Sequence, residues 1–495
     1  MPKQAIVIMV DTQRHDMLGC YGNPDMHTPN LDALCAQGVR FDEAYTCQPV
    51  CGPARSAMFT GLFPHSNGMT TNSVALYANV KTVGQRLSDA AVHTGYIGKW
   101  HLDGGDYFGL GRCPEGWDPN YWYDMKCYLE ELTPEERAFS RDFHNIQRGV
   151  PRSFTYANRV SNRAIDFIQK HKDEDYFLVV SYDEPHDPYL CPEPYVSMYE
   201  HYAWPLSDNA ADDLSAKPAH QRAWAGDALE GPAPTQVSDD AFRAFMACNA
   251  FVDSEIGRVV DALSADAPEA LIVYTADHGD MLRAHRITGK GPAGYEEITH
   301  IPFLVRWKEA PAGAVCPHPT SHIDLTPTML DYFGLPPAHW CEGTSMLDVM
   351  RHPETRLHDQ VFFEFGRYEV DHDGFGGFQP LRAAFDGRYK LIINLMCEDE
   401  LYDLETDPGE LNNLIHCPQT AAQRDRLHDA ILNWMNDTRD PLRGFWWERR
   451  PWRVDARPAT WAYTGMTRQR EHEEYEPRQL DYATGLPMQS ATRKK

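Results

Sequence analysis

A thiol, a proline and a guanidinium lie at fixed spacing in the sequence CGPAR, which begins at Cys51 and ends at Arg55. A thiolate can act as a nucleophile or a metal ligand, and a nearby guanidinium can hold an anion. A helix expected over Ser56–Gly61 would direct its partly positive N-terminus at the same anion. A buried thiol before a proline-led helix start is the alternative explanation of the pentapeptide, so its meaning depends on the rest of the chain.

Other polar side chains follow predicted buried strands, at the point where each strand ends. Asp11 follows the apolar run Ala5–Val10, and Asp277 and His278 follow Ala270–Thr275. Ligands of open α/β sheets bind beyond the carboxyl ends of the strands, so we expect these ends to meet. Further residues of this kind are Lys99 and His101 after a strand that starts at Gly95, His186 after Tyr176–Tyr182, and Lys290 beyond the Asp277 turn.

Taken singly, each of these residues has a plain structural explanation. Asp11 could cap a helix, Asp277 could stabilise a tight turn, and Lys99 or His101 could lie in an exposed loop. Their joint order favours a site for metal-assisted hydrolysis of an anionic ester. Carboxylates and a neutral imidazole bind a divalent cation, basic side chains offset the negative charge of the ester, and histidine transfers protons near neutral pH.

The order of these residues resembles that of the type I, formylglycine-dependent sulfatases, over about residues 4–330 and less specifically in the C-terminal part. The chain is most similar to the arylsulfatase and phosphonate monoester hydrolase branch of the alkaline phosphatase superfamily. The CGPAR motif carries the resemblance. Gly98–His101 looks like the second signature of the family, and Thr28–Asp32 looks like its early helix.

The resemblance implies a covalent mechanism at Cys51. A separate formylglycine-generating enzyme would oxidise this cysteine to formylglycine (3-oxoalanine), which hydrates to a diol. One diol oxygen would attack sulfur or phosphorus, and the other would help to expel the bound ester.

The resemblance also implies roles for the other residues. Asp11, Cys51, Asp277 and His278 would bind one divalent metal. Arg55 would steady the formylglycine hydrate, and His101 would remove a proton from the diol. The residues expected to contact the sulfate or phosphate are Lys99, His186, Lys290 and Asn72, with His186 or Lys290 also supporting the leaving oxygen.

The chain departs from many sulfatases at two positions. Thr12 follows Asp11 where the family often has a second Asp, so Gln13 is a candidate replacement ligand. The late pair is Asp277-His278 rather than Asp-Asn. Ca²⁺ is the expected ion, and the imidazole also admits Mn²⁺ or Zn²⁺. Phosphonate monoester hydrolases look similar at both positions, which keeps a phosphorus ester open as the substrate.

Alternating strands and helices predict an α/β fold with a large, mostly parallel, mixed sheet between helices, over residues 1–360. Closely spaced short strands and one helix predict a small antiparallel subdomain over 361–440. A tail rich in Trp, Arg and Pro follows over 441–495 and is expected to pack on a partner subunit. Residues 103–150 are interpreted as a long functional loop or an insertion, and 204–237 as a surface loop. The polar cluster of Arg367, Glu369, His372 and Asp373 could contact a sugar or form a solvated hairpin.

A net charge of −26 argues against nucleic acid and anionic membranes as partners. The N-terminal apolar run ends at Asp11 without a cleavage site, which favours a cytoplasmic protein, and no apolar run is long enough to span a membrane. Twelve scattered cysteines favour reduced thiols over a disulfide framework. We expect a homo-oligomer, a dimer or a tetramer.

These observations predict a sulfuric ester hydrolase acting on a small sulfated sugar or aryl compound. A phosphonate monoester or phosphodiester hydrolase on the same site is the first alternative. The second is an inactive binding protein whose Cys51 remains a thiol. A relative of the alkaline phosphatase type would carry Ser or Thr as its nucleophile, and Cys51 with Pro53 and Arg55 argues against that.

Overall fold

A seven-stranded sheet with the order β10-β2-β9-β8-β1-β5-β4 forms the centre of the computed structural model, which describes residues 2–105, 108–336, 340–369 and 377–453. Its strands are β1 (Gln4–Val10), β2 (Val39–Phe41), β4 (His93–Gly98), β5 (Tyr176–Ser181), β8 (Leu271–Ala276), β9 (Phe303–Arg306) and β10 (Ala314–Cys316). All neighbouring pairs are parallel except those that β9 makes with β2 and β8. The predicted mixed, mostly parallel sheet is therefore confirmed.

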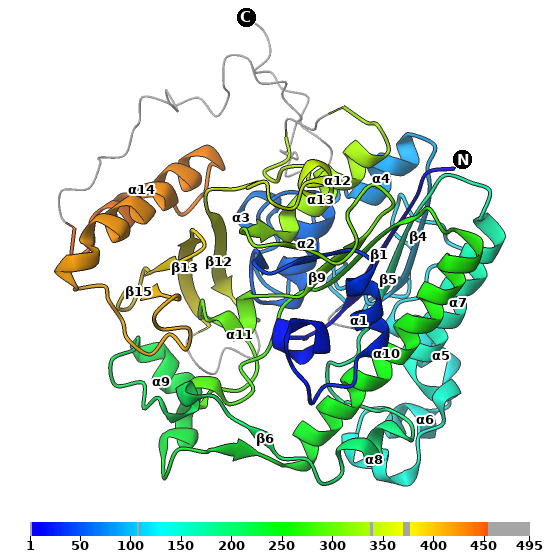
Figure 1. The fold of residues 1–495 in the computed structure, drawn as a ribbon, viewed down its shortest axis with the longest axis horizontal. Coiled ribbons are helices and arrows are strands. Elements are labelled where there is room, and N and C mark those ends of the chain that lie inside the picture. Colours follow the sequence, from blue (N-terminus) through cyan, green and yellow to red (C-terminus); the bar gives the residue numbers. More distant parts are fainter. Residues whose placement is uncertain (1, 106–107, 337–339, 370–376, 454–495) are drawn as a thin grey trace, which may run out of the picture.

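Helices cover both faces of this sheet. Its central strands β1, β5 and β8 are therefore buried along their whole length. Figure 1 shows α7 and α10 side by side along one face and α2 and α12 on the other. The helices are α1 (Pro29–Ala36), α2 (Cys51–Thr60), α3 (Pro64–Asn67), α4 (Val83–Asp89), α5 (Met125–Glu131), α6 (Pro134–Phe139), α7 (Tyr156–His171), α8 (Tyr195–Tyr199), α9 (Ala219–Ala225), α10 (Asp240–Asp266), α11 (Glu296–Thr299), α12 (Leu325–Tyr332), α13 (Leu347–Arg351), α14 (Ala421–Asp437) and α15 (Phe445–Glu448).

A second, four-stranded antiparallel sheet follows in the C-terminal part, as predicted. Its strands, in order, are β12 (Val361–Arg367), β13 (Phe378–Phe385), β14 (Tyr389–Asn394) and β15 (Glu400–Asp403). Helix α14 packs on β13 and β14, beside the central sheet in Figure 1. Two-residue strands form two further small sheets within the described residues: β3 (Ala44–Tyr45) pairs with β11 (Thr320–Ser321), and β6 (Trp204–Pro205) pairs with β7 (Gln236–Val237).

Two segments expected to be loops contain regular structure. In 103–150, Asp124 and Thr133 cap α5 and α6 by accepting hydrogen bonds from backbone N–H groups, a local signal that the irregular hydrophobic pattern hid. In 204–237, Gln221 on α9 is fully buried and Lys217 donates a hydrogen bond to the Tyr402 hydroxyl on β15. The second segment therefore packs against the C-terminal sheet, and its prediction as a surface loop was wrong.

Helix α2 begins at Cys51, five residues before the predicted start, because Pro53 lies in the first turn, where a missing N–H costs nothing. All twelve cysteines are free thiols. Within the described residues no helix is both long and apolar enough to cross a membrane. In the predicted tail, Trp447 is buried and Arg450 pairs with Asp399 at 2.8 Å. Residues 454–495, on which the partner-subunit prediction mainly falls, lie outside the described residues.

Candidate active site

The parallel register of the central strands brings the predicted carboxylates together. Val10 on β1 is opposite Ala276 on β8, so the next residues, Asp11 and Asp277, leave the sheet at the same level. Both side chains are fully buried. Burial and the like charge of Asp11 raise the pKa of the Asp277 carboxyl above its ordinary value. Two adjacent buried carboxylates of this kind favour a positive charge between them.

The thiol of Cys51 lies at the N-terminal end of α2 and faces this pair. Its Sγ is 3.7 Å from Asp11 Oδ1 and 3.2 Å from His278 Nε2. Lys290 Nζ donates to the same sulfur at 3.0 Å. Burial and Asp11 oppose ionisation of the thiol, but Lys290, Lys99 and His278 together hold its pKa well below the ordinary value.

The helix start is fixed by Gly52 and Asn72. The Gly52 N–H donates to Asn72 Oδ1 at 2.8 Å, and a Cβ at position 52 would lie 3.1 Å from that oxygen and 2.7 Å from the Met69 methyl. Asn72 Nδ2 in turn donates to Glu369 at 3.5 Å. Asn72 therefore lies beside the site, with its carbonyl oxygen holding the backbone next to Cys51.

Arg55, one turn further along α2, contacts the carboxylates. Its Nε donates to Asp277 at 2.9 Å and its Nη2 donates to Asp11 at 3.0 Å, and the whole side chain is buried. A third nitrogen, Nη1, donates to the Lys99 carbonyl and the Ser181 hydroxyl. Through these hydrogen bonds Arg55 orients the two carboxylates.

Lys99 and His101 follow β4 and approach the cluster from the other side. Gly98 has φ +125°, and a Cβ there would lie 1.8 Å from the Ser181 carbonyl oxygen, so only glycine allows the chain to turn here. The turn places Lys99 Nζ 2.9 Å from both Asp11 Oδ2 and Asp183 Oδ1. His101 is buried, and neither of its ring nitrogens has a hydrogen-bond partner within the described residues. Burial lowers the pKa of His101, which keeps the imidazole neutral and able to accept a proton.

His186 and Lys290 lie where the cluster opens outward. Both line a cavity of about 440 Å³, together with Thr12 and Tyr368. Burial, Lys99 and Lys290 disfavour a charged imidazole, but Asp11 and a 2.9 Å ion pair with Asp187 raise the pKa of His186 to about 9. The site thus presents two cations, an ammonium and an imidazolium, to an anion entering from the cavity.

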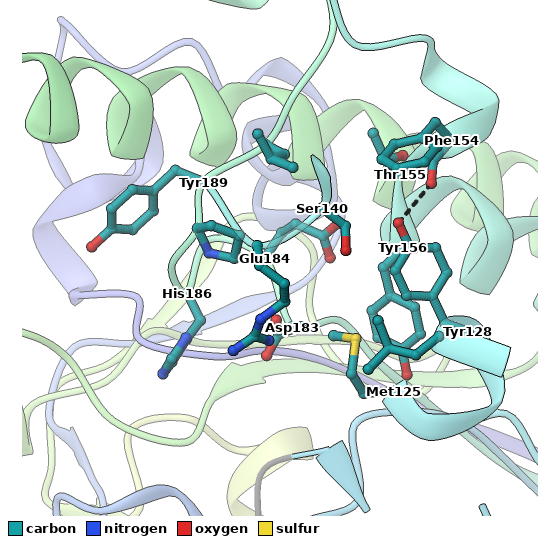
Figure 2. Close-up of a pocket in the computed structure, with 14 residues that line it drawn as sticks. Met125, Tyr128, Ser140, Phe154, Thr155, Tyr156, Asp183, Glu184, His186 and Tyr189 are labelled. Carbon is teal, nitrogen blue, oxygen red and sulfur yellow. Dashed lines mark hydrogen bonds between the residues drawn. The ribbon is translucent and has the colours of Figure 1, made fainter. Parts of the chain in front are cut away.

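A second, smaller cavity of about 40 Å³ adjoins the first behind His186. Figure 2 shows Asp183, Glu184 and His186 together on the segment that follows β5. Glu184 accepts a hydrogen bond from the Ala157 N–H at 2.9 Å, its other carboxyl oxygen has no partner within the described residues, and burial raises its pKa to about 8. This carboxyl is therefore largely protonated near neutral pH.

Two residues of the site were missed by the sequence analysis. Asp183, a partner of Lys99, lies two residues beyond the end of β5, so the strand-end rule could have found it. Tyr368 comes from the end of β12, and its carbonyl accepts hydrogen bonds from the Asn72 N–H and the Thr71 hydroxyl. No sequence signal marks Tyr368, since only the docking of the second sheet brings it to the cavity.

The candidate ligand Gln13 points away from the cluster. Its amide nitrogen donates to Asn249 at 2.8 Å and its oxygen accepts from the Tyr274 hydroxyl. Both groups are thus used inside the core, and the prediction that this oxygen replaces the missing Asp was wrong. Thr12 stays at the site, because its hydroxyl donates to Asp11 at 2.6 Å. Of the polar cluster near the C-terminal sheet, Arg367 ends β12 and Glu369 contacts Asn72, while His372 and Asp373 lie outside the described residues.

The four predicted metal ligands converge in a way that fits a cation. Donor atoms of Asp11, Cys51, Asp277 and His278 all lie within 4.8 Å of one another, and all four residues are buried. His278 Nδ1 lies 2.9 Å from the Gly279 carbonyl and so carries a proton, and Nε2 would present its lone pair to a cation once it is deprotonated. Two carboxylates and one oriented imidazole are the donor set of a divalent ion.

The chain is similar to known protein families and to individual proteins. The family described as Sulfatase matches residues 3–335, and the family described as N-sulphoglucosamine sulphohydrolase, C-terminal, matches residues 292–437. The protein named Uncharacterized sulfatase YidJ of Escherichia coli K12 is 44% identical over 495 residues, covering 98% of this chain and 97% of that protein.

Two further likenesses are more distant. The Arylsulfatase of Clostridium perfringens is 26% identical over 465 residues, covering 87% of this chain and 94% of its own. The crystal structure of the phosphonate monoester hydrolase of Agrobacterium radiobacter superposes with a TM-score of 0.74 at 23% identity, covering 88% of this chain and 96% of that one. At this identity the superposition shows a shared fold.

Proposed function

This chain belongs to the sulfatase family and is a hydrolase of sulfate ester bonds, and we propose that it cleaves small sulfate monoesters with a formylglycine made from Cys51 and one divalent metal ion. The observation that carries this proposal is the convergence of Cys51, Asp11, Asp277 and His278 within 4.8 Å, beside the Lys290 ammonium. An ordinary buried thiol is surrounded by apolar groups, whereas this one meets the donors and cations that an anionic ester requires.

Asp11, Asp277, His278 and residue 51 would hold the metal. Ca²⁺ is the ion we propose first, since carboxylate oxygens supply much of the donor set, with Mn²⁺ or Zn²⁺ favoured by the imidazole. A bound divalent cation supplies polarisation of the ester oxygens and favours an ionised nucleophile. Arg55 would keep both carboxylates in place through its two ion pairs of 2.9 and 3.0 Å.

Residue 51 would be the nucleophile after its oxidation by a formylglycine-generating enzyme. Hydrated formylglycine supplies a hydroxyl where the thiol now lies, and the Sγ atom stands in for that oxygen. The thiol position is 3.0 Å from Lys290 Nζ, which supports an anionic nucleophile there. The low pKa of the Cys51 thiol has the same cause, since the surrounding cations stabilise negative charge at this point.

The remaining side chains would bind the substrate anion and move protons. Lys290, the His186 imidazolium and Lys99 would neutralise the sulfate oxygens, and His186 or Lys290 would support the departing oxygen. His101 would accept the proton from residue 51 when the ester is released, because its pKa is lowered by burial and its ring nitrogens have no competing partner within the described residues.

A phosphonate monoester or phosphodiester hydrolase is the second candidate. The observation that favours it is the pair Thr12 and His278, at which the chain resembles the phosphonate hydrolases more than many sulfatases. The site charge does not decide between the two ester classes, because a sulfate monoester and a phosphonate monoester both carry one negative charge.

Paired turnover assays test the proposal. Protein produced together with a formylglycine-generating enzyme is offered 4-nitrophenyl sulfate and 4-nitrophenyl phenylphosphonate under identical conditions. We expect a higher kcat/KM for the sulfate ester. A higher kcat/KM for the phosphonate would support the second candidate, and absence of turnover of either ester by protein converted at residue 51 would contradict both.

A further inference from the structure

The cavity of about 440 Å³ leads outward from the candidate active site and has a floor and an outer wall. The floor consists of Thr12, His186, Lys290 and Tyr368. Sites for small molecules span roughly 300–1,000 Å³, so this cavity accommodates a sulfate group together with one adjoining small group. The floor is used by the sulfate in the proposed function, and the outer wall must therefore select the leaving group.

One side of the outer wall is aromatic. Tyr189 and Trp224 are half-buried and line the cavity, with Phe245 behind them. The rings of Tyr189 and Phe245 meet edge to face at 5.9 Å, and Phe242 lies 6.4 Å from Phe245. Tyr156 lines the smaller cavity, and Figure 2 shows the Tyr189 ring pointing away from it. These supported rings offer flat apolar faces, against which a planar or ring-shaped group packs.

The charged side of the outer wall is acidic. Asp187, Asp239 and Asp280 line the cavity, and Arg283 is the cation among them. Arg283 donates to Asp239 at 3.1 Å, so its charge is already compensated. Within the described residues the outer wall thus carries three carboxylates and one guanidinium. Asp239 is paired with that guanidinium and Asp187 with His186 at 2.9 Å, which leaves one carboxylate, Asp280, in excess. A leaving group with its own sulfate or carboxylate would meet repulsion here and no spare cation.

We infer that this cavity selects sulfate esters whose leaving group is a single uncharged ring and discriminates against esters that carry a second anionic group. This inference rests on the proposed function, because it takes the floor as the sulfate-binding part. Trp224 provides the face on which the ring packs, Asp280 provides the repulsion, and Asp239 keeps Arg283 from pairing with a second anion. Sugar and aryl rings share this chemistry, and separate substrates distinguish them.

A matched substrate pair tests the charge discrimination. N-acetylglucosamine 6-sulfate and glucosamine-2-N,6-O-disulfate share the ring and the scissile ester, and they differ by one anionic group. We expect kcat/KM to be at least about tenfold higher for the monosulfate. 4-Nitrophenyl sulfate, measured beside them, reports whether an aryl ring serves better than a sugar ring.

Two variants test the assigned residues. Asp239→Asn keeps the side-chain oxygen that caps α10 but releases Arg283. It should raise kcat/KM for the disulfate about fivefold and change kcat/KM for the monosulfate less than about twofold. Adding Arg283→Gln should cancel the gain.

Trp224→Ala should raise KM for ring esters about tenfold and change KM for methyl sulfate, which has no ring, less than about twofold. Trp446→Ala, at a Trp that is 69% exposed on α15, is the matched control.

The outcomes separate this inference from the function on which it rests. If no sulfate ester is turned over by converted protein, the proposed function fails. If aryl sulfate is turned over but the disulfate is hydrolysed as fast as the monosulfate, or Asp239→Asn leaves their ratio unchanged, the inference about the outer wall is overturned and the proposed function stands.

Discussion

Two clusters of buried charge in this molecule resemble each other in composition and differ in how their groups are paired. The first is the candidate active site around Cys51. The second, which we call the interface cluster, consists of His65, Glu364, Arg382 and Asp440, with side chains no more than 3% exposed. It joins α3 on the central-sheet side to β12, β13 and the segment after α14. Donor atoms of three of its members also lie within 4.8 Å of one another.

In the interface cluster every described partner is an opposite charge or a hydrogen-bonding group of the protein. Arg382 Nε donates to Asp440 at 2.5 Å, and both carboxyl oxygens of Glu364 accept from His65. His65 Nε2 donates to the Thr438 hydroxyl, which itself donates to the Trp434 carbonyl. The network is closed, and the space between its acids is taken by a guanidinium. Such a cluster fixes the docking of two sheets.

In the active-site cluster the donor atoms of Asp11, Cys51, Asp277 and His278 converge within 4.8 Å of one another, beside the cavity that Lys290 lines. Asp11 and Asp277 are held by Arg55 from behind, while His278 Nε2 and Cys51 Sγ face inward and His101 has both ring nitrogens unpaired within the described residues. The comparison teaches that buried charge alone does not indicate chemistry. Donor atoms that converge at the edge of a cavity are the feature that separates a reactive site from a structural one.

The largest effect should come from residue 51. Cys51→Ala should lower turnover of an aryl sulfate by at least about a thousandfold, because the nucleophile is lost, while the melting temperature stays within a few degrees. Cys248→Ala, a buried cysteine on α10 outside the site, is the matched control and should keep turnover. Near-normal turnover by Cys51→Ala would place the chemistry elsewhere.

Metal removal should have the next largest effect. Dialysis against a chelator should abolish turnover, and Ca²⁺, Mn²⁺ or Zn²⁺ should restore it to different extents, since the donors of Asp11, Asp277 and His278 need a cation. Asp277→Asn should weaken the measured metal affinity about tenfold or more by removing one anionic ligand. Elemental analysis and titration calorimetry check both. Full activity of a protein shown to be metal-free would refute the interpretation of this cluster as a metal site.

Breaking the interface cluster should affect stability and spare the chemistry. Glu364→Gln leaves His65 without its carboxylate and takes from Arg382 the weaker of its two carboxylate partners. It should cost about 3 kcal/mol of unfolding free energy, with kcat changed less than about threefold. Glu405→Gln breaks an exposed pair with Arg388 and should leave the unfolding free energy nearly unchanged, because solvent screens this pair. Denaturant titrations measure the unfolding free energy, and turnover assays of the same samples measure kcat. A large loss of kcat without loss of stability would show that the closed cluster also serves the reaction.

The smallest effect concerns pH. Burial disfavours charge on His65, but Glu364 outweighs it and raises the pKa of His65 in the folded state. A raised folded pKa stabilises the protein fully below the unfolded value of about 6.5, and the contribution is lost as pH rises through the folded value. The stability difference between wild type and His65→Asn should therefore be larger at pH 6 than at pH 9. Equal differences at both pH values would show that His65 contributes by packing alone.

Much of the fold could be predicted because its signals are local. The apolar runs that became β1, β5 and β8 are buried on both faces, and a run of this kind is typical of a parallel sheet between helices. The strand-end rule then brought Asp11, Asp277 and Lys99 to one place, because parallel strands in register end at the same edge.

The rest depends on contacts between distant segments. Tyr368 reaches the cavity only because the second sheet docks beside α2, and Trp224 does so only because α9 packs under that sheet. Gln13 has the right chemistry and place in sequence for a ligand, yet Asn249 and Tyr274 hold it in the core. Side-chain direction of this kind is decided by packing, which a sequence pattern does not record.

Peptide mass spectrometry across residue 51, on preparations whose specific activity toward an aryl sulfate spans a wide range, tests the central claim most directly. The preparations are made with graded amounts of a formylglycine-generating enzyme. We expect a mass loss corresponding to conversion of the thiol to an aldehyde, with the converted fraction proportional to the specific activity. Full activity in a preparation whose residue 51 is an unmodified thiol would contradict the account.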